Sequence, residues 1–296
     1  MLRSMTGFGR AEGLVDPGTP NTAAKKVTVE VRSLNSKQLD LFIKLPSLYK
    51  EKDTELRQLV SETVMRGKAE VSVQSELAPG VRRGSYDTAV VKALYDELRA
   101  VTQAVDPNAQ TDLMGLVLRM PEVTGSANES LGEPEWKGVH ALVKEALKAY
   151  QSFREAEGRK LHDDLRMRCD RIESLLNEVD AQDSGRAERT RERIQGRLAE
   201  LQAKVDQDRF EQELVFYLEK MDINEEKVRL RTHCAYFRET LEKEEQQGRK
   251  LGFITQEMGR EINTLGSKAN DAIMQRNVVL MKDELEKIKE QVLNVL

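Results

Sequence analysis

A long helical stretch in the C-terminal half of the chain limits the possible folds most strongly. Residues 219–241 contain neither Pro nor Gly, and from Trp136 onward most segments carry apolar residues at helical spacing. Apolar residues that recur every three or four positions indicate amphipathic helices. The sequence therefore predicts a mostly α-helical C-terminal region with long amphipathic, coiled-coil-like helices.

A polar stripe runs along residues 219–241, which we expect to form one helix. Its members follow the first at offsets of 4, 7 and 11 positions: Asp222, Glu226, Arg229 and His233. At about 100° per residue, they lie within about 60° of one another. An apolar stripe lies roughly a quarter turn away and consists of Ile223, Leu230, Cys234, Phe237 and Leu241. The polar stripe therefore follows the edge of the predicted buried face.

A second polar stripe with the same spacing follows a helix break near Gly248. It consists of Glu257, Glu261, Thr264 and Lys268, beside an apolar stripe of Ile254, Met258, Ile262, Leu265 and Ala269. If the two helices pack through their apolar stripes, both polar edges line one groove. Carboxylates with a single imidazole are suitable ligands for a divalent metal ion. Asn263 projects away from this stripe, and we expect it to make a structural hydrogen bond.

The same spacing also fits a purely structural explanation. The chain has 33% charged residues, and carboxylates and bases four positions apart usually form solvated pairs on a helix surface. A His at a helix edge is more often solvated or capped than catalytic. The spacing alone leaves both the metal site and the solvated pairs open.

Five segments of the chain resemble a known family. They are MLRSMTGFGRAE (residues 1–12), VEVRSLNSKQLDLFIKLP (29–46), LRMPEV (118–123), FREAEGRKL (153–161) and GRKLGFITQEMGREINTLGSKANDA (248–272). Their order and their spread from end to end are similar to those of the bacterial YicC/YloC family. The resemblance implies a metal-dependent endoribonuclease that acts on RNA. It also implies a hexamer with a helical, clamshell-like interior.

The resemblance and the two stripes together give a set of candidate site residues. We expect His233, Glu257 and Glu261 to be catalytic, with His233 either a metal ligand or the general acid/base. The expected metal ligands are Asp222, Glu226, Glu257 and Glu261, and Mn²⁺ or Mg²⁺ suits this set better than zinc. The expected RNA contacts are the basic residues Arg32, Lys37, Arg229, Arg260 and Lys268.

The N-terminal region has the pattern of a compact α+β domain. The expected strands are residues 27–31, 39–45 and 68–77. Ser47 caps an expected helix at residues 47–65, and residues 13–24 are expected to form a loop. This region has an excess of basic residues in a chain of net charge −4. A surface that neutralises RNA phosphates is therefore expected here.

The middle of the chain is expected to serve assembly more than chemistry. One very long helix is predicted at residues 139–179, with a possible bend at Gly158, and residues 186–204 form a helical arm. The expected domains are residues 1–84, 85–205 and 206–296.

Composition supports a cytoplasmic protein that forms homo-oligomers. The two cysteines, Cys169 and Cys234, indicate a reducing compartment, and neither a signal peptide nor a membrane-spanning run is evident. Only 39% of residues are hydrophobic, which suits long helices or protomers that bury surface against each other. Cys234 lies in the apolar stripe, so we expect a packed thiol rather than a nucleophile.

The function predicted from all of this is cleavage of phosphodiester bonds in regulatory or structured RNA by a metal-dependent endoribonuclease. Two alternatives remain at this stage. A non-catalytic RNA-binding or adaptor oligomer would need the basic surface but not the carboxylates. A purely structural oligomer would need the helical arms and neither charge set.

Overall fold

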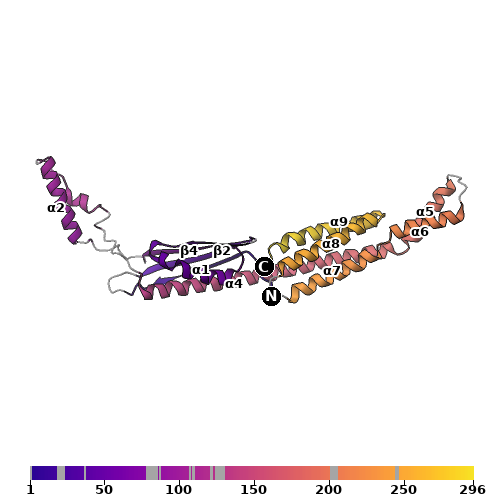
Figure 1. The fold of residues 1–296 in the computed structure, drawn as a ribbon, viewed down its shortest axis with the longest axis horizontal. Coiled ribbons are helices and arrows are strands. Elements are labelled where there is room, and N and C mark those ends of the chain that lie inside the picture. The colour runs from indigo at the N-terminus through magenta and orange to yellow at the C-terminus, as the bar shows by residue number, and fades with distance from the viewer. Residues whose placement is uncertain are drawn as a thin grey trace.

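The protein is an elongated molecule with a sheet half and a helical half (Figure 1). The computed structural model describes residues 2–18, 24–36, 38–77, 86, 88–106, 108, 111–120, 123, 131–200, 206–243 and 247–296. The predicted fold class is confirmed: a small α+β unit precedes a mostly helical region. The predicted domain boundaries at residues 84 and 205 lie outside the described residues.

A four-stranded sheet forms the core of the N-terminal half. Its strands are β1 (Gly7–Val15), β2 (Lys25–Leu34), β3 (Leu39–Lys44) and β4 (Gly67–Leu77), in the order β1-β2-β4-β3. β3 is parallel to β4, and the other neighbours are antiparallel. Alternate residues of β1 and β2 are buried, because successive side chains of a strand point to opposite faces. One face therefore packs on helices and the other is open.

Strand β1 was not predicted, and the expected loop at residues 13–24 was wrong at its start, because β1 continues to Val15. The glycines of β1 interrupt the alternation of apolar and polar residues that indicates a strand, but the packing of β1 on a helix requires them. A Cβ on Gly9 would lie 2.1 Å from the carbonyl oxygen of Ala146 on helix α4 (Glu133–Asp183). The strand and the helix backbone can therefore approach closely only without a side chain here.

The helix predicted at residues 47–65 is present, but its first residues form a 3₁₀ helix instead of an α-helix. A 3₁₀ segment, η1 (Ser47–Lys52), precedes helix α1 (Asp53–Val64). The N-cap position is Pro46 and no side chain caps the segment, so the cap predicted for Ser47 is wrong. Helix α1 and the first part of α4 cover the same face of the sheet.

Helix α4 joins the two halves without interruption. It has 51 residues, which at 1.5 Å per residue is about 76 Å. Its residues from Trp136 to Tyr150 belong to the sheet core, and those from Leu165 to Val179 belong to the core of the helical half. The predicted helix at residues 139–179 is therefore confirmed and extends further at both ends.

Four helices form the bundle of the helical half. They are α4, α7 (Asn224–Lys243), α8 (Gly248–Lys268) and α9 (Ala272–Val292). Contacts run from α4 to α7, α7 to α8, α8 to α9 and α9 to α4, so α8 lies diagonally opposite α4. Both predicted apolar stripes lie in this core. The break predicted near Gly248 is the start of α8.

The expectation of one helix across residues 219–241 was wrong. Helix α6 (Gln207–Lys220) ends before Met221, and α7 begins at Asn224. The side chain of Asp222 accepts a hydrogen bond from the backbone N–H of Asn224, 3.0 Å away. Asp residues favour such bonds at helix starts, and this one separates the two helices without Gly or Pro.

Two further elements extend from the ends of the molecule. Helices α5 (Arg186–Glu200) and α6 form the predicted arm at the bundle end. At the sheet end lie α2 (Thr88–Val105) and α3 (Leu113–Val117) (Figure 1). No helix among the described ranges is long and apolar enough to cross a membrane.

Both chain termini meet at the middle of α4 (Figure 1). The backbone N–H of Met5 donates to the carbonyl of Asn294, and the N–H of Leu296 donates to the carbonyl of Arg3. Arg154 on α4 donates through Nε to the carbonyl of Ser4 at 2.6 Å. Burial lowers the pKa of the Arg154 guanidinium. The terminal segments therefore connect the two halves where their cores end.

Gly158 permits this junction, and we expect its substitution to be costly. A Cβ at Gly158 would lie 2.0 Å from the carbonyl oxygen of Leu2. Gly158→Ala should lower the free energy of unfolding by about 1–3 kcal/mol, as overpacking does, although Ala normally stabilises a helix. Chemical denaturation measures the change. The control is Gly196→Ala on α5, where nothing lies within 4 Å and stability should rise by roughly 0.5–1 kcal/mol. Equal stabilisation by both variants would contradict the close approach at Gly158.

Candidate functional site

The two predicted polar stripes meet along the contact between α7 and α8, which we call the α7/α8 seam. Nζ of Lys268, at the end of α8, lies 2.8 Å from Oε1 of Glu226, near the start of α7. The two helices are therefore antiparallel. This contact supports the predicted arrangement in which the two polar edges face each other.

This ion pair fixes which residues lie level along the seam. His233 follows Glu226 by seven positions, and Glu261 precedes Lys268 by seven positions. Seven residues are about two turns, with a drift of only about 20°. His233 and Glu261 therefore lie at the same level of the seam, roughly 10 Å from the ion pair at 1.5 Å per residue.

The carboxylate of Glu261 has an unusual environment. The residue is 5% exposed, and within the described ranges its carboxylate makes no hydrogen bond or ion pair. Neither of its oxygens is among the described side-chain atoms that are buried without a partner, so the carboxylate reaches solvent at the seam and is open to a ligand. Glu257, four positions earlier on the same edge of α8, is half-buried and also has no such contact with a described residue.

Glu226 is also incompletely satisfied. It is 4% exposed, and Lys268 contacts only its Oε1. Its Oε2 is buried without a hydrogen-bond partner among the described residues. An unpaired buried oxygen is a point where an ion or water can bind.

The carboxylate oxygens at the seam are suitable ligands for a hard divalent cation, but the carboxylates do not form one compact cluster. Carboxylate oxygens are the ligands that Mg²⁺ and Mn²⁺ prefer. Within the described part of the chain, however, no three His, Cys, Asp or Glu side chains are close enough to hold a metal ion together. Mg²⁺ usually keeps several waters and uses one or two protein carboxylates, so Glu257 and Glu261 fit such an ion as a pair.

Asp222 and Arg229 lie away from the centre of the seam. Asp222 is exposed between α6 and α7, where it bonds to the backbone of Asn224. Arg229 is exposed and forms an ion pair with Glu225 on its own helix. Neither side chain contacts Glu257 or Glu261.

The two predicted RNA contacts of the N-terminal domain have different outcomes. Lys37 lies outside the described residues. Arg32 lies on the open face of the sheet, where it is 2.8 Å from Glu30 and 5.5 Å from the ring centroid of Phe8. Other cations of this face also pair with carboxylates, such as Lys44 with Glu70. Much of the predicted basic surface is therefore neutralised locally.

A network of ion pairs, which was not predicted from the sequence, fixes the start of α7. Nζ of Lys227 lies 2.7 Å from Asp180 and 2.8 Å from Asp183, both on α4. Burial acts against the Lys227 charge, but these two hydrogen bonds outweigh it and raise the pKa of the ammonium. Hydrogen bonds from Lys227 and Arg231 lower the pKa of Asp180. The network holds Glu226, the neighbour of Lys227, at the seam.

The cysteines have the structural role that was predicted for Cys234. Both are buried, and Sγ of Cys169 lies 3.6 Å from the carbonyl oxygen of Cys234. A hydrogen bond with Cys169, together with burial, raises the pKa of the Cys234 thiol. A thiol with a raised pKa is a poor nucleophile.

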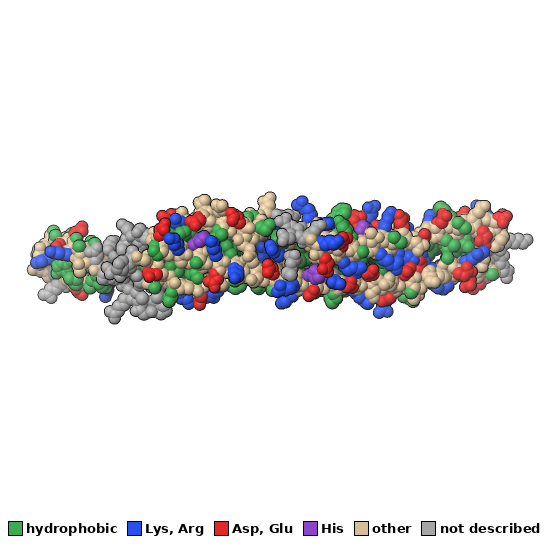
Figure 2. All heavy atoms as spheres, turned by 90° about the horizontal axis from the view of Figure 1, so that it is seen from below, with side chains coloured by type: hydrophobic (Ala, Val, Ile, Leu, Met, Phe, Trp, Pro, Cys, Tyr) green, Lys and Arg blue, Asp and Glu red, His purple; other side chains and the backbone are tan. Residues whose placement is uncertain are grey.

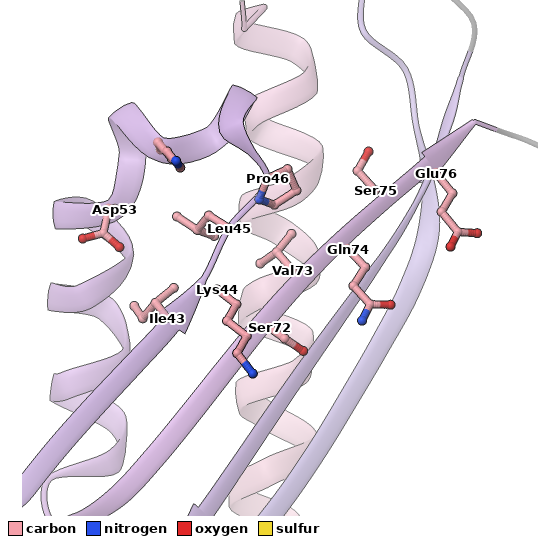
Figure 3. A pocket seen from close by; sticks show the side chains of 11 residues that line it. Ile43, Lys44, Leu45, Pro46, Asp53, Ser72, Val73, Gln74, Ser75 and Glu76 are labelled. Carbon is pink, nitrogen blue, oxygen red and sulfur yellow. The ribbon is translucent and has the colours of Figure 1, made fainter. Parts of the chain in front are cut away.

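Two hollows lie away from the seam. One has a volume of about 850 Å³ and lies beside β3 and β4 (Figure 3). It forms because β3 ends at Lys44 while β4 continues to Leu77. A second hollow of about 440 Å³ lies at the base of the arm, and Asp222 is part of its wall. Neither hollow contains Glu257, Glu261 or His233.

A third stripe, which we call the outer stripe, lies on the exposed side of α8. It consists of Arg249, Phe253, Gln256, Arg260, Asn263 and Ser267, and all six residues are exposed. Of these six residues, only Arg260 was predicted from the sequence to bind RNA. The alternating spacing of four and three residues was visible in the sequence and could have revealed the rest. The hydrogen bond expected for Asn263 is not formed with any described residue.

Basic and acidic side chains are mixed over the surface seen in Figure 2. Nucleic-acid binding by this protein therefore needs a local surface on which cations are not already paired.

Two family models match the chain, and curated relatives are similar to it along its whole length. The model described as "Endoribonuclease YicC-like, N-terminal region" matches residues 2–163, and "Endoribonuclease YicC-like, C-terminal" matches residues 179–296. A "Probable endoribonuclease YicC" of Clostridioides difficile (strain 630) is 32% identical over 300 residues. A protein of the same name from Haemophilus influenzae (strain ATCC 51907 / DSM 11121 / KW20 / Rd) is 30% identical over 297 residues. Both matches cover 100% of this chain and of the relative. The chain therefore belongs to the YicC-like family.

Proposed function

We propose that this protein is a metal-dependent endoribonuclease whose active site lies at the α7/α8 seam. The observation that carries the proposal is the row of unpaired carboxylate oxygens at the seam. Glu257 and Glu261 have no partner among the described residues, and Oε2 of Glu226 is buried without one. Membership of a family described as endoribonucleases supports RNA as the substrate.

Glu257 and Glu261 would hold the divalent ion, with Mn²⁺ or Mg²⁺ as the proposed metal. Held there, such an ion would offset negative charge on the scissile phosphate and activate a water for attack. His233 lies level with Glu261 and is half-buried, so its imidazole can transfer a proton as a general acid or base. Arg260 would hold a phosphate oxygen through its planar guanidinium.

The remaining candidates receive supporting roles. Glu226 is engaged by Lys268, so this pair positions the seam, although the free Oε2 of Glu226 remains a possible ligand. Asp222 starts α7 and is the weakest of the proposed ligands. Arg32, Lys37 and Arg229 would contribute to RNA binding outside the seam.

The first test removes the two carboxylates. Glu257→Gln and Glu261→Gln should each lower the rate of RNA cleavage by at least about 10²-fold, and EDTA should abolish wild-type cleavage. Calorimetry should show weaker Mn²⁺ binding by both variants. Glu290→Gln, an exposed change on α9, should cleave like wild type.

The outcomes separate catalytic from structural roles. Melting temperatures are compared first, because loss of stability would mimic loss of catalysis. If both Gln variants fold and cleave RNA as fast as wild type, the metal assignment is wrong. If the wild type binds RNA but never cleaves it with Mn²⁺ or Mg²⁺, the non-catalytic RNA-binding oligomer is correct instead.

The second test concerns the imidazole at the seam. His233→Ala should lower the cleavage rate by roughly 10²–10⁴-fold, the range for loss of a general acid or base. His162→Ala is the matched control, because His162 lies on α4 beside Asp163 and Glu242 and not at the seam. Single-turnover kinetics measure both rates. Equal rates for His233→Ala and wild type would exclude a proton-transfer role.

We also propose that the protein is a homo-oligomer, with a hexamer as the favoured state. Helix α2 has no buried residue, and its Val101 and Val105 are 54% and 80% exposed. An amphipathic helix normally buries its apolar face. The expected result of multi-angle light scattering is a hexamer at micromolar concentration. Val101→Glu/Val105→Glu should reduce the mass, and a monomeric wild type would contradict the proposal.

A further inference from the structure

The outer stripe of α8 combines cations, an aromatic ring and uncharged polar groups on one exposed side of the helix. Of its six residues, two are cations, one is aromatic, and three carry uncharged polar side chains. It contains no carboxylate from Arg249 to Ser267. Carboxylates are otherwise common, since the chain has 51 Asp and Glu residues.

The two guanidinium groups of the outer stripe, those of Arg249 and Arg260, form no ion pair with any residue that the structure describes. On α7, by contrast, Arg229 pairs with Glu225, and Arg238 lies 2.6 Å from Glu173. The free positive charge on α8 can therefore meet an anionic ligand without first breaking an ion pair.

Phe253 lies between these cations and is 62% exposed. A second exposed aromatic residue, Tyr236 on α7, is 42% exposed and has Nζ of Lys250 at 5.0 Å from its ring centroid. Exposed rings among cations are typical of surfaces on which nucleic-acid bases stack. The stripe thus combines groups for phosphates with a surface for a base.

We propose that the outer stripe binds single-stranded RNA beside the α7/α8 seam. Arg249 and Arg260 contact phosphates, an unpaired base stacks on Phe253, and Gln256 and Asn263 bond to base or sugar groups. An RNA duplex hides the faces of its bases, whereas splayed-out single-stranded bases can stack on aromatic side chains. The ligand is therefore the single-stranded part of an RNA.

The position of the stripe gives this binding a role in cleavage. Glu257 lies between the outer stripe and the seam, four positions after Phe253 and three before Arg260. Arg249 and Arg260 are separated by roughly 16 Å at 1.5 Å per residue. A strand that contacts both cations therefore passes beside the proposed metal ligands. This role rests on the proposed function, but the binding itself does not.

The test measures binding without cleavage. Full-length protein is titrated in EDTA against a fluorescein-labelled, unstructured RNA oligonucleotide and against the same strand in a duplex, and anisotropy is recorded. Wild type should prefer the single strand. Phe253→Ala should weaken single-strand binding by about 5- to 100-fold. Arg249→Gln and Arg260→Gln should each reduce the slope of log K against log salt by about 0.7.

Matched controls lie on other faces of the molecule. Arg276→Gln changes an exposed Arg on α9, and Phe153→Ala changes a ring on α4 that is 45% exposed. Both should bind RNA like wild type. Control variants that weaken binding as much as the stripe variants, or stripe variants that bind normally, would overturn the proposal.

Two further results separate this inference from its alternatives. If Phe253→Ala or Arg249→Gln lowers the mass measured by light scattering and leaves RNA affinity unchanged, the stripe contacts a second copy of the chain and the inference is wrong. If the stripe variants lose RNA binding while wild type never cleaves RNA, the inference holds and the proposed endoribonuclease activity fails.

Discussion

The structure depends on helix α4, because its two halves belong to two different hydrophobic cores. A long helix derives most of its stability from the elements packed on it. The sheet packs on the part before Gly158, and α7 and α9 pack on the part after it. The terminal segments 2–5 and 293–296 meet beside Gly158, so they close the boundary between the cores.

The periodic parts of this architecture could be predicted from the sequence. The apolar stripes of α7 and α8 are buried as expected, because a stripe at helical spacing has one stable position, against a core. Two features of the fold were not predicted from the sequence, and both have local causes. The glycines of β1 suppress the strand pattern, although Gly9 is required by the backbone of α4. The break at Asp222 is made by one side-chain hydrogen bond, which periodicity does not reveal.

The candidate site was predictable as a pattern but not as a set of contacts. Equal offsets on α7 and α8 predicted two facing edges, and the pair of Glu226 with Lys268 supports that geometry. Which carboxylates stay free depends on partners distant in sequence. Lys227, for example, is neutralised by Asp180 and Asp183 of α4, more than 40 positions earlier. The spacing within one helix carries no information about such partners.

The charged side chains of the bundle fall into two groups, those that form ion pairs between helices and those that form none with a described residue. Ion pairs that link α4 to α7 satisfy groups such as Lys227 and Arg238, and they hold the helices in place. Glu261 receives no such partner among the described residues although it is 5% exposed. Its carboxylate therefore adds nothing to the links between the helices and remains available for a ligand at the seam. Arg249 and Arg260 of the outer stripe lie on the same helix as this carboxylate and form no ion pair with a described residue. Helix α8 therefore carries several charged groups that make no contact within the described fold.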